Sequence, residues 1–329
     1  MSLRLSLART AAPRALVMTA GLGTRLRPLT ERRAKAAVPV NGVPLARRVI
    51  DWLAQHDVRD LVLNLHHQPA SIAAQVGDGA DFGVRVRYSW EQPVVLGSGG
   101  GPRHALSLLV DDMRDTCLLV NGDTLTDLDP NALLDEHFAS GAIVTMALIP
   151  NPRPDKYSGV LVNGEGWITA FTRAGSEGPS FHYIGVQAAI GQAFAGLDDG
   201  VPALSVGGVY SLLMRDNPRS LRAFICDASF QDIGTPADCL ETTLELANVE
   251  GDRMRSSTAS VDVSAHVIRT ALWDDVTVAA NAHLTDCIVA DGVTIPSGAR
   301  YERCAIVPGG SRAPEQDEEL ENGLLIRRF

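Results

Sequence analysis

The sequence predicts an α/β protein with a mostly parallel sheet, followed by a short β-helix built from six-residue repeats. Two observations carry this prediction. Short apolar runs alternate with stretches of helical apolar spacing through the first half of the chain, which indicates βαβ units. Beyond about residue 256, apolar residues recur every five or six positions, a spacing that fits neither a helix nor an ordinary strand.

The first half of the chain begins with a short apolar run at residues 14–21 that stops at a glycine, as a buried strand does before a loop. Helical spacing at 44–58 and strand spacing at 59–67 complete one βαβ unit. The alternation continues with helix 70–79, strand 84–90, a glycine-rich turn, helix 102–109, strand 116–123, helix 131–141 and strand 142–149. Ligands gather at the carboxyl ends of parallel strands, so we expect a site at the turns near Gly21 and Asp123.

The sequence pattern changes twice in the second half of the chain. From about residue 150 to 247 the pattern indicates shorter strands and turns, with a hairpin at 158–173 and a final helix at 236–248. The repeats that follow place one inward residue on each side of a coil, and nine positions predict about three coils. These positions are Val261, Val267, Leu272, Val278, Leu284, Val289, Ile295, Tyr301 and Ile306.

These changes in the sequence pattern divide the 329-residue chain into segments. We expect an N-terminal extension at 1–13, a main domain at 14–250 with halves that meet at about 150, a β-helix at 256–310 and an acidic tail at 311–329. The tail ends in an apolar segment that can dock on the fold.

Composition excludes several classes of protein. The longest apolar runs fall well short of the roughly 18 residues that span a bilayer, so no membrane partner is expected. A net charge of −10 argues against a general nucleic-acid binder. A locally positive pocket for a small polyanion remains compatible with this charge.

The cysteines and lysines are both informative. Five cysteines, an odd number without a C-x-x-C pair, favour reduced thiols in a cytoplasmic protein over a zinc site or a disulfide framework. Lys35 and Lys156 are the only lysines among 29 basic residues. Lysine offers a compact charge that fits a crowded phosphate site, and Lys35 lies in the most distinctive motif of the chain.

That motif is the stretch GLGTRLRPLTERRAKAAVPV at residues 21–40. It matches neither a dinucleotide fingerprint, because Leu26 occupies the third glycine position, nor a P-loop. Gly21 and Gly23 let a bare backbone approach phosphates, and Arg25 offers a fork suited to pyrophosphate.

The motif resembles the signature of the sugar-1-phosphate nucleotidylyltransferases, G-x-G-T-R-x-R-P-x-T followed after four residues by K-P-x-x-P-V. Ala36 stands where the family usually has proline, which could loosen the loop that holds Lys35. Three further matches follow in the family's order: residues 91–106 resemble the base-reading segment, N-G-D contributes Asp123, and F-Q-D-I-G-T-P contributes Asp232. The resemblance covers about residues 14 to 247.

The resemblance implies a Rossmann-like sheet of the nucleotide-diphospho-sugar transferase fold with a left-handed β-helix, as many members carry. It also implies transfer of a nucleotidyl group from a nucleoside triphosphate to a sugar 1-phosphate with Mg²⁺. The catalytic residues would be Arg25, Lys35, Asp123 and Asp232, the last two as metal ligands. The nucleotide would contact Ala20, Gly21, Gly23, Thr24, Arg25, Gly99, Gly100, Asn121 and Gly122, and the sugar phosphate would contact Lys35, Gly159, Arg173 and Gly185.

Charge and positioning dominate such a reaction, since the sugar phosphate is already anionic and no covalent nucleophile is needed. Asp123 and Asp232, each at the end of an apolar run, are expected to converge on one metal ion. On the sugar side the family's E-K pair is replaced by Thr172 and Arg173, and Arg173 is expected to take over the phosphate contact.

The base and sugar stay open. The GSGGG segment resembles mannose- and heptose-1-phosphate guanylyltransferases, and N-L-H-H resembles muramate-type uridylyltransferases; we rank guanylyl first, uridylyl second and adenylyl third. A catalytically silent regulatory subunit is an alternative of another class. The flat coil faces of the β-helix predict a homo-oligomer.

Overall fold

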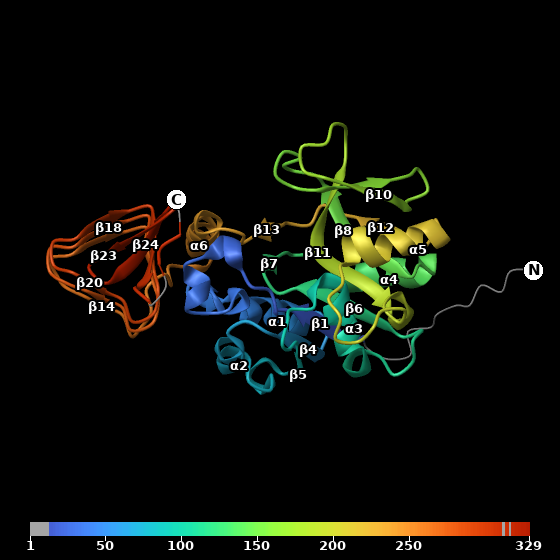
Figure 1. Ribbon diagram of the computed structural model, residues 1–329, viewed down its shortest axis with the longest axis horizontal. Coiled ribbons are helices and arrows are strands. Elements are labelled where there is room, and N and C mark those ends of the chain that lie inside the picture. The colour runs from blue at the N-terminus through green and yellow to red at the C-terminus, as the bar shows by residue number, and fades with distance from the viewer. Residues whose placement is uncertain (1–12, 311–312, 316) are drawn as a thin grey trace, which may run out of the picture. The chain divides into compact units, whose positions relative to one another are not determined.

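The computed structural model describes residues 13–310, 313–315 and 317–329 (Figure 1). The chain divides into two compact units. Unit 1 comprises residues 13–21, 48–67 and 76–230. Unit 2 comprises residues 22–47, 68–75 and the described residues from 231 to 329. Residues 1–12 of the expected N-terminal extension lie outside the described residues.

Unit 1 is built on a mixed sheet of nine strands. The strands are β1 (Ala15–Met18), β4 (Asp60–Leu65), β5 (Arg85–Trp90), β6 (Thr116–Asn121), β8 (Val144–Pro150), β9 (Gly159–Val162), β10 (Ile168–Thr172), β11 (Phe181–Ile190) and β12 (Leu221–Ile225). Their order is β10-β9-β11-β6-β1-β4-β5, with β8 beside β11 and β12 beside β8. The predicted parallel core is confirmed, because β6, β1, β4 and β5 are parallel, and β11 adds to it in the antiparallel direction.

Helices cover this sheet, and one of them, α5 (Tyr210–Asp216), lies in the part of the chain expected to hold only short strands and turns. α3 (Gly97–Leu109) packs on β1 and β4, α4 (Pro130–Ser140) packs on β8 and β11, and α5 packs on β12. α1 (Leu45–Gln55) and α2 (Pro69–Val76) match the helices expected at 44–58 and 70–79. β1 is buried nearly throughout, which explains its uninterrupted apolar sequence.

The ends of α4 follow from local sequence. The Asp129 side chain accepts a hydrogen bond from the Asn131 N–H at 2.9 Å, and Pro130 occupies the first turn. Gly141 ends the helix in the left-handed conformation at φ 66°.

The start of α3 differs from the prediction, because the glycine-rich segment expected as a turn belongs to the helix. A Cβ built on Gly100 would lie 2.6 Å from the Val201 carbonyl oxygen, and one on Gly101 would lie 2.6 Å from Glu91 Oε1. Glycine is therefore required here by close tertiary packing, which outweighs its low helix propensity.

Shorter elements connect these parts. They are β2 (Pro39–Val40), β3 (Val43–Pro44), β7 (Thr124–Leu125), β13 (Gln231–Asp232), the 3-10 helices η1 (Thr24–Leu26), η2 (Leu29–Glu31), η3 (Lys35–Ala37), η4 (Ala80–Phe82) and η5 (Gly191–Ala193), and the kinked segment η6 (Ser205–Val209). In the described part of the chain, no helix has both the length and the apolar character to cross a membrane.

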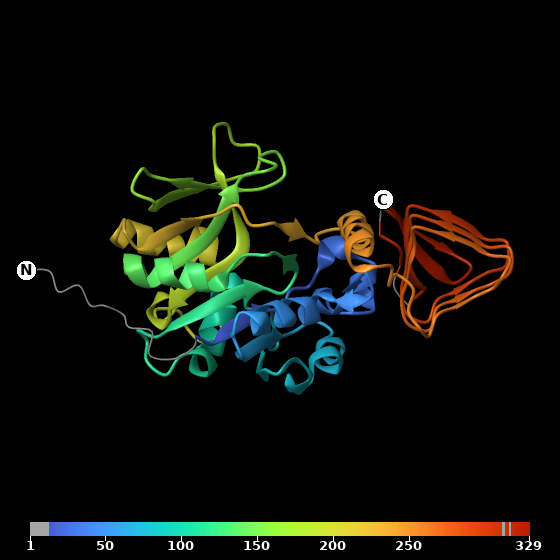
Figure 2. The ribbon, with the colours of Figure 1, turned by 180° about the vertical axis from the view of Figure 1, so that it is seen from behind.

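Unit 2 contains α6 (Pro236–Glu250) and three sheets of short parallel strands, stacked as the coils of a β-helix (Figure 2). The strands are β14 (Ser260–Val261), β17 (Thr277–Val278) and β20 (Thr294–Ile295); β15 (His266–Ile268), β18 (His283–Thr285) and β21 (Arg300–Glu302); and β16 (Ala271–Leu272), β19 (Ile288–Val289) and β22 (Cys304–Pro308).

The strand residues of a coil pair with the residues 17 positions later, as Ser260 does with Thr277 and Thr277 with Thr294. The nine positions predicted to point inward form or pack against a single buried cluster, and seven of them are at most 4% exposed. The β-helix and its inward residues are thus confirmed.

Part of the segment expected as an acidic tail is ordered into two strands. β24 (Leu324–Arg328) pairs antiparallel with β22, and β23 (Glu318–Glu321) pairs with β24. Leu324 and Ile326 enter the buried cluster of the β-helix, so this hairpin covers apolar surface of the last coil.

Candidate active site

The carboxyl ends of β1 and β6 lie side by side in unit 1, where Met18 pairs with Asn121. The Gly122 N–H donates to the Met18 carbonyl at 3.0 Å, and a Cβ on Gly122 would lie 2.7 Å from Thr19 Cγ2. The start of the glycine loop and the N-G-D turn, both predicted to bind nucleotide, therefore lie at one edge of the sheet.

Gly185 packs against the same edge. It has a left-handed φ of 83°, and a Cβ at this position would lie 2.9 Å from Asn121 Nδ2. The structure thus groups Gly185 with Asn121, and it is not among the described residues that line the cavity holding Gly159 and Arg173.

Tyr183 is a neighbour of Asp123 that the sequence analysis missed. Burial raises the pKa of Tyr183, and the charges of Tyr210 and Asp123 add to the rise. The Tyr183 hydroxyl is buried and has no hydrogen-bond partner among the described residues. The register of β11 shifts between Tyr183 and Gln187, so alternation from Gly185 along the sequence gave no reliable signal for Tyr183.

In unit 2 the glycine loop folds back on itself and brings Gly23 to Lys35. Gly23 has a left-handed φ of 61°, and a Cβ here would lie 2.7 Å from Thr30 Cγ2 and 3.1 Å from Lys35 Cβ. Thr30 Oγ1 donates to the Gly23 carbonyl at 3.0 Å and fixes this fold. The glycine cradle and the predicted catalytic lysine are thereby adjacent.

Ala36, where the family has proline, is 2% exposed inside η3. The Ala37 N–H donates to the Ala34 carbonyl at 2.8 Å, and the Ala34 N–H donates to Ser71 Oγ at 2.9 Å. Burial and these hydrogen bonds define the turn that carries Lys35.

Arg25 and Asp232 flank one backbone position, Gly234. A Cβ on Gly234 would lie 2.8 Å from Arg25 Nη1 and 3.2 Å from Asp232 Oδ2. Lys35 is close enough to α6 that its charge opposes the rise in the pKa of Cys239, which burial raises to about 12. Three of the four predicted catalytic residues therefore belong to unit 2, together with Thr24 on η1, and Asp123 belongs to unit 1.

Within the described ranges, no cluster of three or more His, Cys, Asp or Glu side chains is placed to hold a metal ion. Mg²⁺ commonly takes one or two protein carboxylates and completes its shell with water and substrate phosphates. Asp123 and Asp232 each fit that donor chemistry, and their sharing of one ion stays a prediction.

The amides of Gly99 and Gly100 are used within unit 1. Both donate to the Ala203 carbonyl, at 2.9 and 3.2 Å. Ser98 Oγ accepts hydrogen bonds from the N–H and the hydroxyl of Ser205, each at 3.0 Å. A Cβ on Gly99 or Gly100 would also meet the backbone of residues 201–204, so this face of both glycines is covered, and their contact with a nucleotide stays a prediction.

A buried carboxylate, Glu91, links the residue after β1 to the residue before α3. It is 1% exposed and accepts hydrogen bonds from Asn64 Nδ2 at 2.7 Å and from the Leu96 N–H at 2.6 Å. Asn64 Oδ1 in turn accepts from the Thr19 N–H at 2.6 Å. Glu91 began the motif recognised in the sequence, but its buried position depends on tertiary packing.

Gly159 and Arg173, two of the predicted sugar-phosphate residues, line a cavity of about 660 Å³ in unit 1. Thr172 pairs with Gly159 across the β9–β10 hairpin and also faces this cavity. The structure thus brings the substituted E-K positions and Gly159 to one site.

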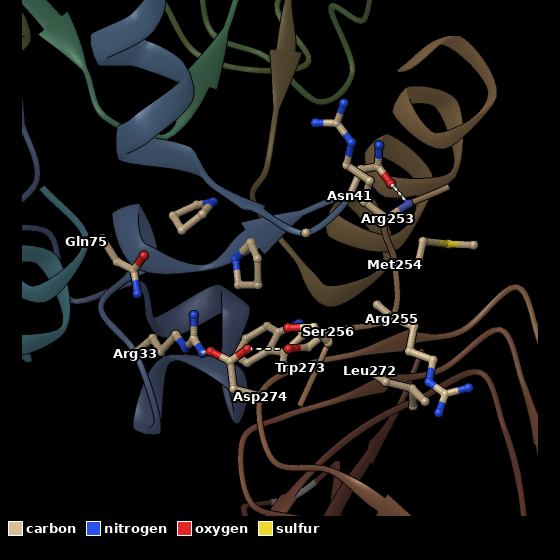
Figure 3. A pocket seen from close by; sticks show the side chains of 15 residues that line it. Arg33, Asn41, Gln75, Arg253, Met254, Arg255, Ser256, Leu272, Trp273 and Asp274 are labelled. Atoms are coloured by element: carbon tan, nitrogen blue, oxygen red, sulfur yellow. Dashed lines mark hydrogen bonds and ion pairs between the residues drawn. The ribbon is translucent and has the colours of Figure 1, made fainter. Parts of the chain in front are cut away.

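A second cavity, of about 360 Å³, lies in unit 2 beside Arg33, two residues before Lys35 (Figure 3). Arg33 Nε donates to Asp291 Oδ2 at 2.7 Å, and Nη2 donates to Asp274 Oδ2 at 2.6 Å. The guanidinium lies 5.4 Å from the centre of the Trp273 ring. The loop that carries Lys35 is thereby anchored to the first two coils of the β-helix.

The chain is similar in sequence to several known proteins. The chain is 28% identical over 237 residues to a mannose-1-phosphate guanylyltransferase of Mycobacterium tuberculosis, covering 70% of this chain and 64% of that protein. It is 25% identical over 235 residues to a D-glycero-alpha-D-manno-heptose 1-phosphate guanylyltransferase of Aneurinibacillus thermoaerophilus, covering 70% and 97%. It is 40% identical over 97 residues to an N-acetylmuramate alpha-1-phosphate uridylyltransferase of Caulobacter vibrioides, covering 29% and 40%.

The fold is shared with a solved structure, HddC from Yersinia pseudotuberculosis complexed with GMP-PN, at a TM-score of 0.59 and 18% identity over 71% of this chain and 99% of that one. The chain spans 64%, 43% and 60% of the length of three curated relatives it matches. The family model described as Nucleotidyl transferase matches residues 14–179, half of the chain. The chain therefore belongs to the nucleotidyl transferase family.

Proposed function

We propose that the protein is a sugar-1-phosphate nucleotidylyltransferase that converts a nucleoside triphosphate and a sugar 1-phosphate into an NDP-sugar and pyrophosphate. The observation that carries the proposal is the fold of the loop in unit 2, which sets Gly23 against Lys35 and sets Arg25 beside Asp232 at Gly234. A bare glycine backbone with nearby cations suits a triphosphate.

In the proposed reaction a phosphate oxygen of the sugar 1-phosphate attacks the α-phosphorus, and the bond from that phosphorus to the bridging oxygen breaks. Pyrophosphate leaves with the electron pair. Lys35 would offset charge on the α-phosphate and the incoming phosphate, and Arg25 would hold the leaving pyrophosphate. Mg²⁺, held by Asp123 and Asp232, would supply further positive charge to the phosphates.

GTP with a mannose- or heptose-type 1-phosphate is the proposed substrate pair, supported by the two guanylyltransferase relatives that align with 70% of the chain. UTP with an N-acetylmuramate 1-phosphate is the second candidate, and the 40% identity over 97 residues favours it. We further propose a cytoplasmic enzyme, supported by the five free thiols, and a homo-oligomer formed through the β-helix.

The test is a coupled assay of pyrophosphate release with four nucleoside triphosphates and a panel of sugar 1-phosphates. We expect turnover with at least one pair, abolished by EDTA and restored by Mg²⁺. Asp123→Asn and Asp232→Asn should each lower kcat by about 10² to 10³. Substrate binding without turnover by any pair would refute the proposal and favour a regulatory subunit, and unchanged rates in either variant would refute its assignment as a metal ligand.

A further inference from the structure

The C-terminal hairpin of unit 2 contacts the glycine loop as well as the β-helix. Along β24, Leu324 and Ile326 enter the buried cluster of the β-helix. Side chains alternate along a strand, so Leu325 and Arg327 lie on the opposite face of the hairpin. Leu325 is nevertheless only 2% exposed, and η2 of the glycine loop packs on the neighbouring strand β22. The outer face of the hairpin is therefore covered as well.

Arg327 on this face bonds the hairpin to the glycine loop. Its Nη1 donates to the Arg27 carbonyl at 2.8 Å and, at a longer 3.5 Å, to the Arg25 carbonyl. The Arg27 side chain is held by the segment just before the hairpin, because its Nη1 donates to Glu315 Oε1 at 2.7 Å. The C-terminal part of the chain thus contacts both the backbone and a side chain of the loop.

The two carbonyls lie at the end of η1, the 3-10 helix that contains Arg25. The Arg27 N–H donates to the Thr24 carbonyl at 3.3 Å, which leaves the carbonyls of Arg25 and Arg27 to donors outside η1. Carbonyls at the end of a helix lack partners within it and are stabilised by a nearby cation. Arg327 supplies that cation from a position 300 residues after Arg27 in the chain.

Arg25 is held at both ends by parts of unit 2 that are distant in the sequence. Its backbone contacts Arg327 on a strand fixed from two sides, where Arg327 pairs with Ala305 of β22 and with Glu318 of β23. Its guanidinium lies at the turn before α6, since a Cβ on Gly234 would be 2.8 Å from Arg25 Nη1. The hairpin and this turn together define where the guanidinium points.

We propose that Arg327 is a positioning residue for nucleotidyl transfer, because it fixes the backbone of Arg25 and thereby orients the guanidinium that binds the leaving pyrophosphate. The inference rests on the proposed function, which gives Arg25 that role. Stabilisation of a leaving group depends on cations that are held in place before the reaction. The hairpin then serves the active site in addition to covering the last coil.

Arg327→Met tests the proposal, and Arg328→Met is its matched control. Both variants remove one positive charge from β24, but Arg328 donates to Glu319 at 2.7 Å in an exposed pair. In the forward reaction, Arg327→Met should lower kcat about 10-fold and leave KM for the sugar 1-phosphate unchanged. In the reverse reaction it should raise KM for pyrophosphate about 10-fold. Arg328→Met should change each value by less than about 2-fold.

Two further variants separate positioning from a loss of stability. Both contacts of Arg327 come from one nitrogen, so a lysine ammonium can replace it, and Arg327→Lys should recover most of kcat. Arg25→Met should raise KM for pyrophosphate about 100-fold. Adding Arg327→Met to it should raise KM by less than about 2-fold more, because Arg327 acts through Arg25. Independent effects that multiply, or equal kinetics in Arg327→Met and Arg328→Met, would overturn the inference.

Calorimetric titration with inorganic pyrophosphate and Mg²⁺ distinguishes a failure of the inference from a failure of the proposed function. If no substrate pair is turned over and Arg25→Met leaves the Kd for pyrophosphate unchanged, the proposed function fails and the inference fails with it. If Arg25→Met weakens binding and Arg327→Met does not, the inference alone is overturned. Weaker binding in both variants, with little further loss in the double variant, supports it.

Discussion

Arg33→Met removes the cation that joins the Lys35 loop to the β-helix. Arg33 is 11% exposed at its side chain and contacts two carboxylates, Asp291 at 2.5 Å and Asp274 at 2.6 Å. Methionine keeps much of the apolar stem but removes the guanidinium that lies over Trp273, and it leaves two neighbouring negative charges without their shared partner.

The expected loss of stability follows from the exposure of the two carboxylates that Arg33 contacts. Asp291 is 21% exposed and Asp274 50%, so the cost lies between that of a surface pair, at most about 1 kcal/mol, and that of a broken buried pair, about 3–5 kcal/mol. We expect a loss of about 2–3 kcal/mol in the free energy of unfolding. This corresponds to a decrease of about 5–10 °C in Tm.

Thermal unfolding of the variant is compared with Arg269→Met, which breaks the exposed Arg269–Asp286 pair of the same β-helix. The control should change stability by less than about 1 kcal/mol. In the pyrophosphate-release assay, Arg33→Met should lower kcat about 10-fold, with a smaller change in KM for the triphosphate, and Arg33→Lys should restore part of it. Equal Tm shifts in Arg33→Met and Arg269→Met, or an unchanged kcat, would contradict this role.

Three further outcomes are expected. Gly21→Ala places a Cβ where no described atom lies within 4 Å, so Tm should stay unchanged while KM for the triphosphate rises about 10-fold; a large loss of Tm would contradict the open loop. Glu91→Gln turns one accepted hydrogen bond into a donor–donor contact and should lower the free energy of unfolding in urea by about 1–3 kcal/mol, and no change would show the buried network to be dispensable. Burial lowers the pKa of His137 to about 4, so the unfolded state binds a proton that the folded state does not as pH falls below about 6.5. The free energy of unfolding should therefore fall by about 3 kcal/mol between pH 6.5 and pH 4 from this group, and urea titrations of His137→Gln should lack that part of the decline.

The β-helix was predictable from the sequence because its signal is a repeat. The spacings of the nine inward positions repeat as six, five and six residues, and their sum of 17 is the strand register of the β-helix. A burial pattern that is set by local periodicity can be predicted without knowing the rest of the fold. The alternation of apolar runs with helical spacing, which predicted the parallel sheet, is a local pattern of the same kind.

The helix at Gly97–Leu109 shows what local sequence patterns do not predict. Its glycines indicate a turn by propensity, and only the nearby backbone of residues 201–204 explains why they are helical. The burial of Glu91 and the hydroxyl of Tyr183 were missed for the same reason, since each depends on segments far apart in the sequence. The candidate residues of the glycine loop were found because one continuous motif contains them.

Because one coil has 17 residues, the β-helix can lengthen or shorten only by whole coils. Insertion of a complete coil between two existing ones would lengthen the β-helix and return the chain to the same sheet. The terminal hairpin would then pair with a strand in the same position as its present neighbour. Insertion of a single six-residue repeat would instead carry the hairpin to the next face and expose the apolar cluster it covers. Duplication of one coil is thus a mutation that this architecture tolerates, whereas shorter insertions are confined to the corners between strands.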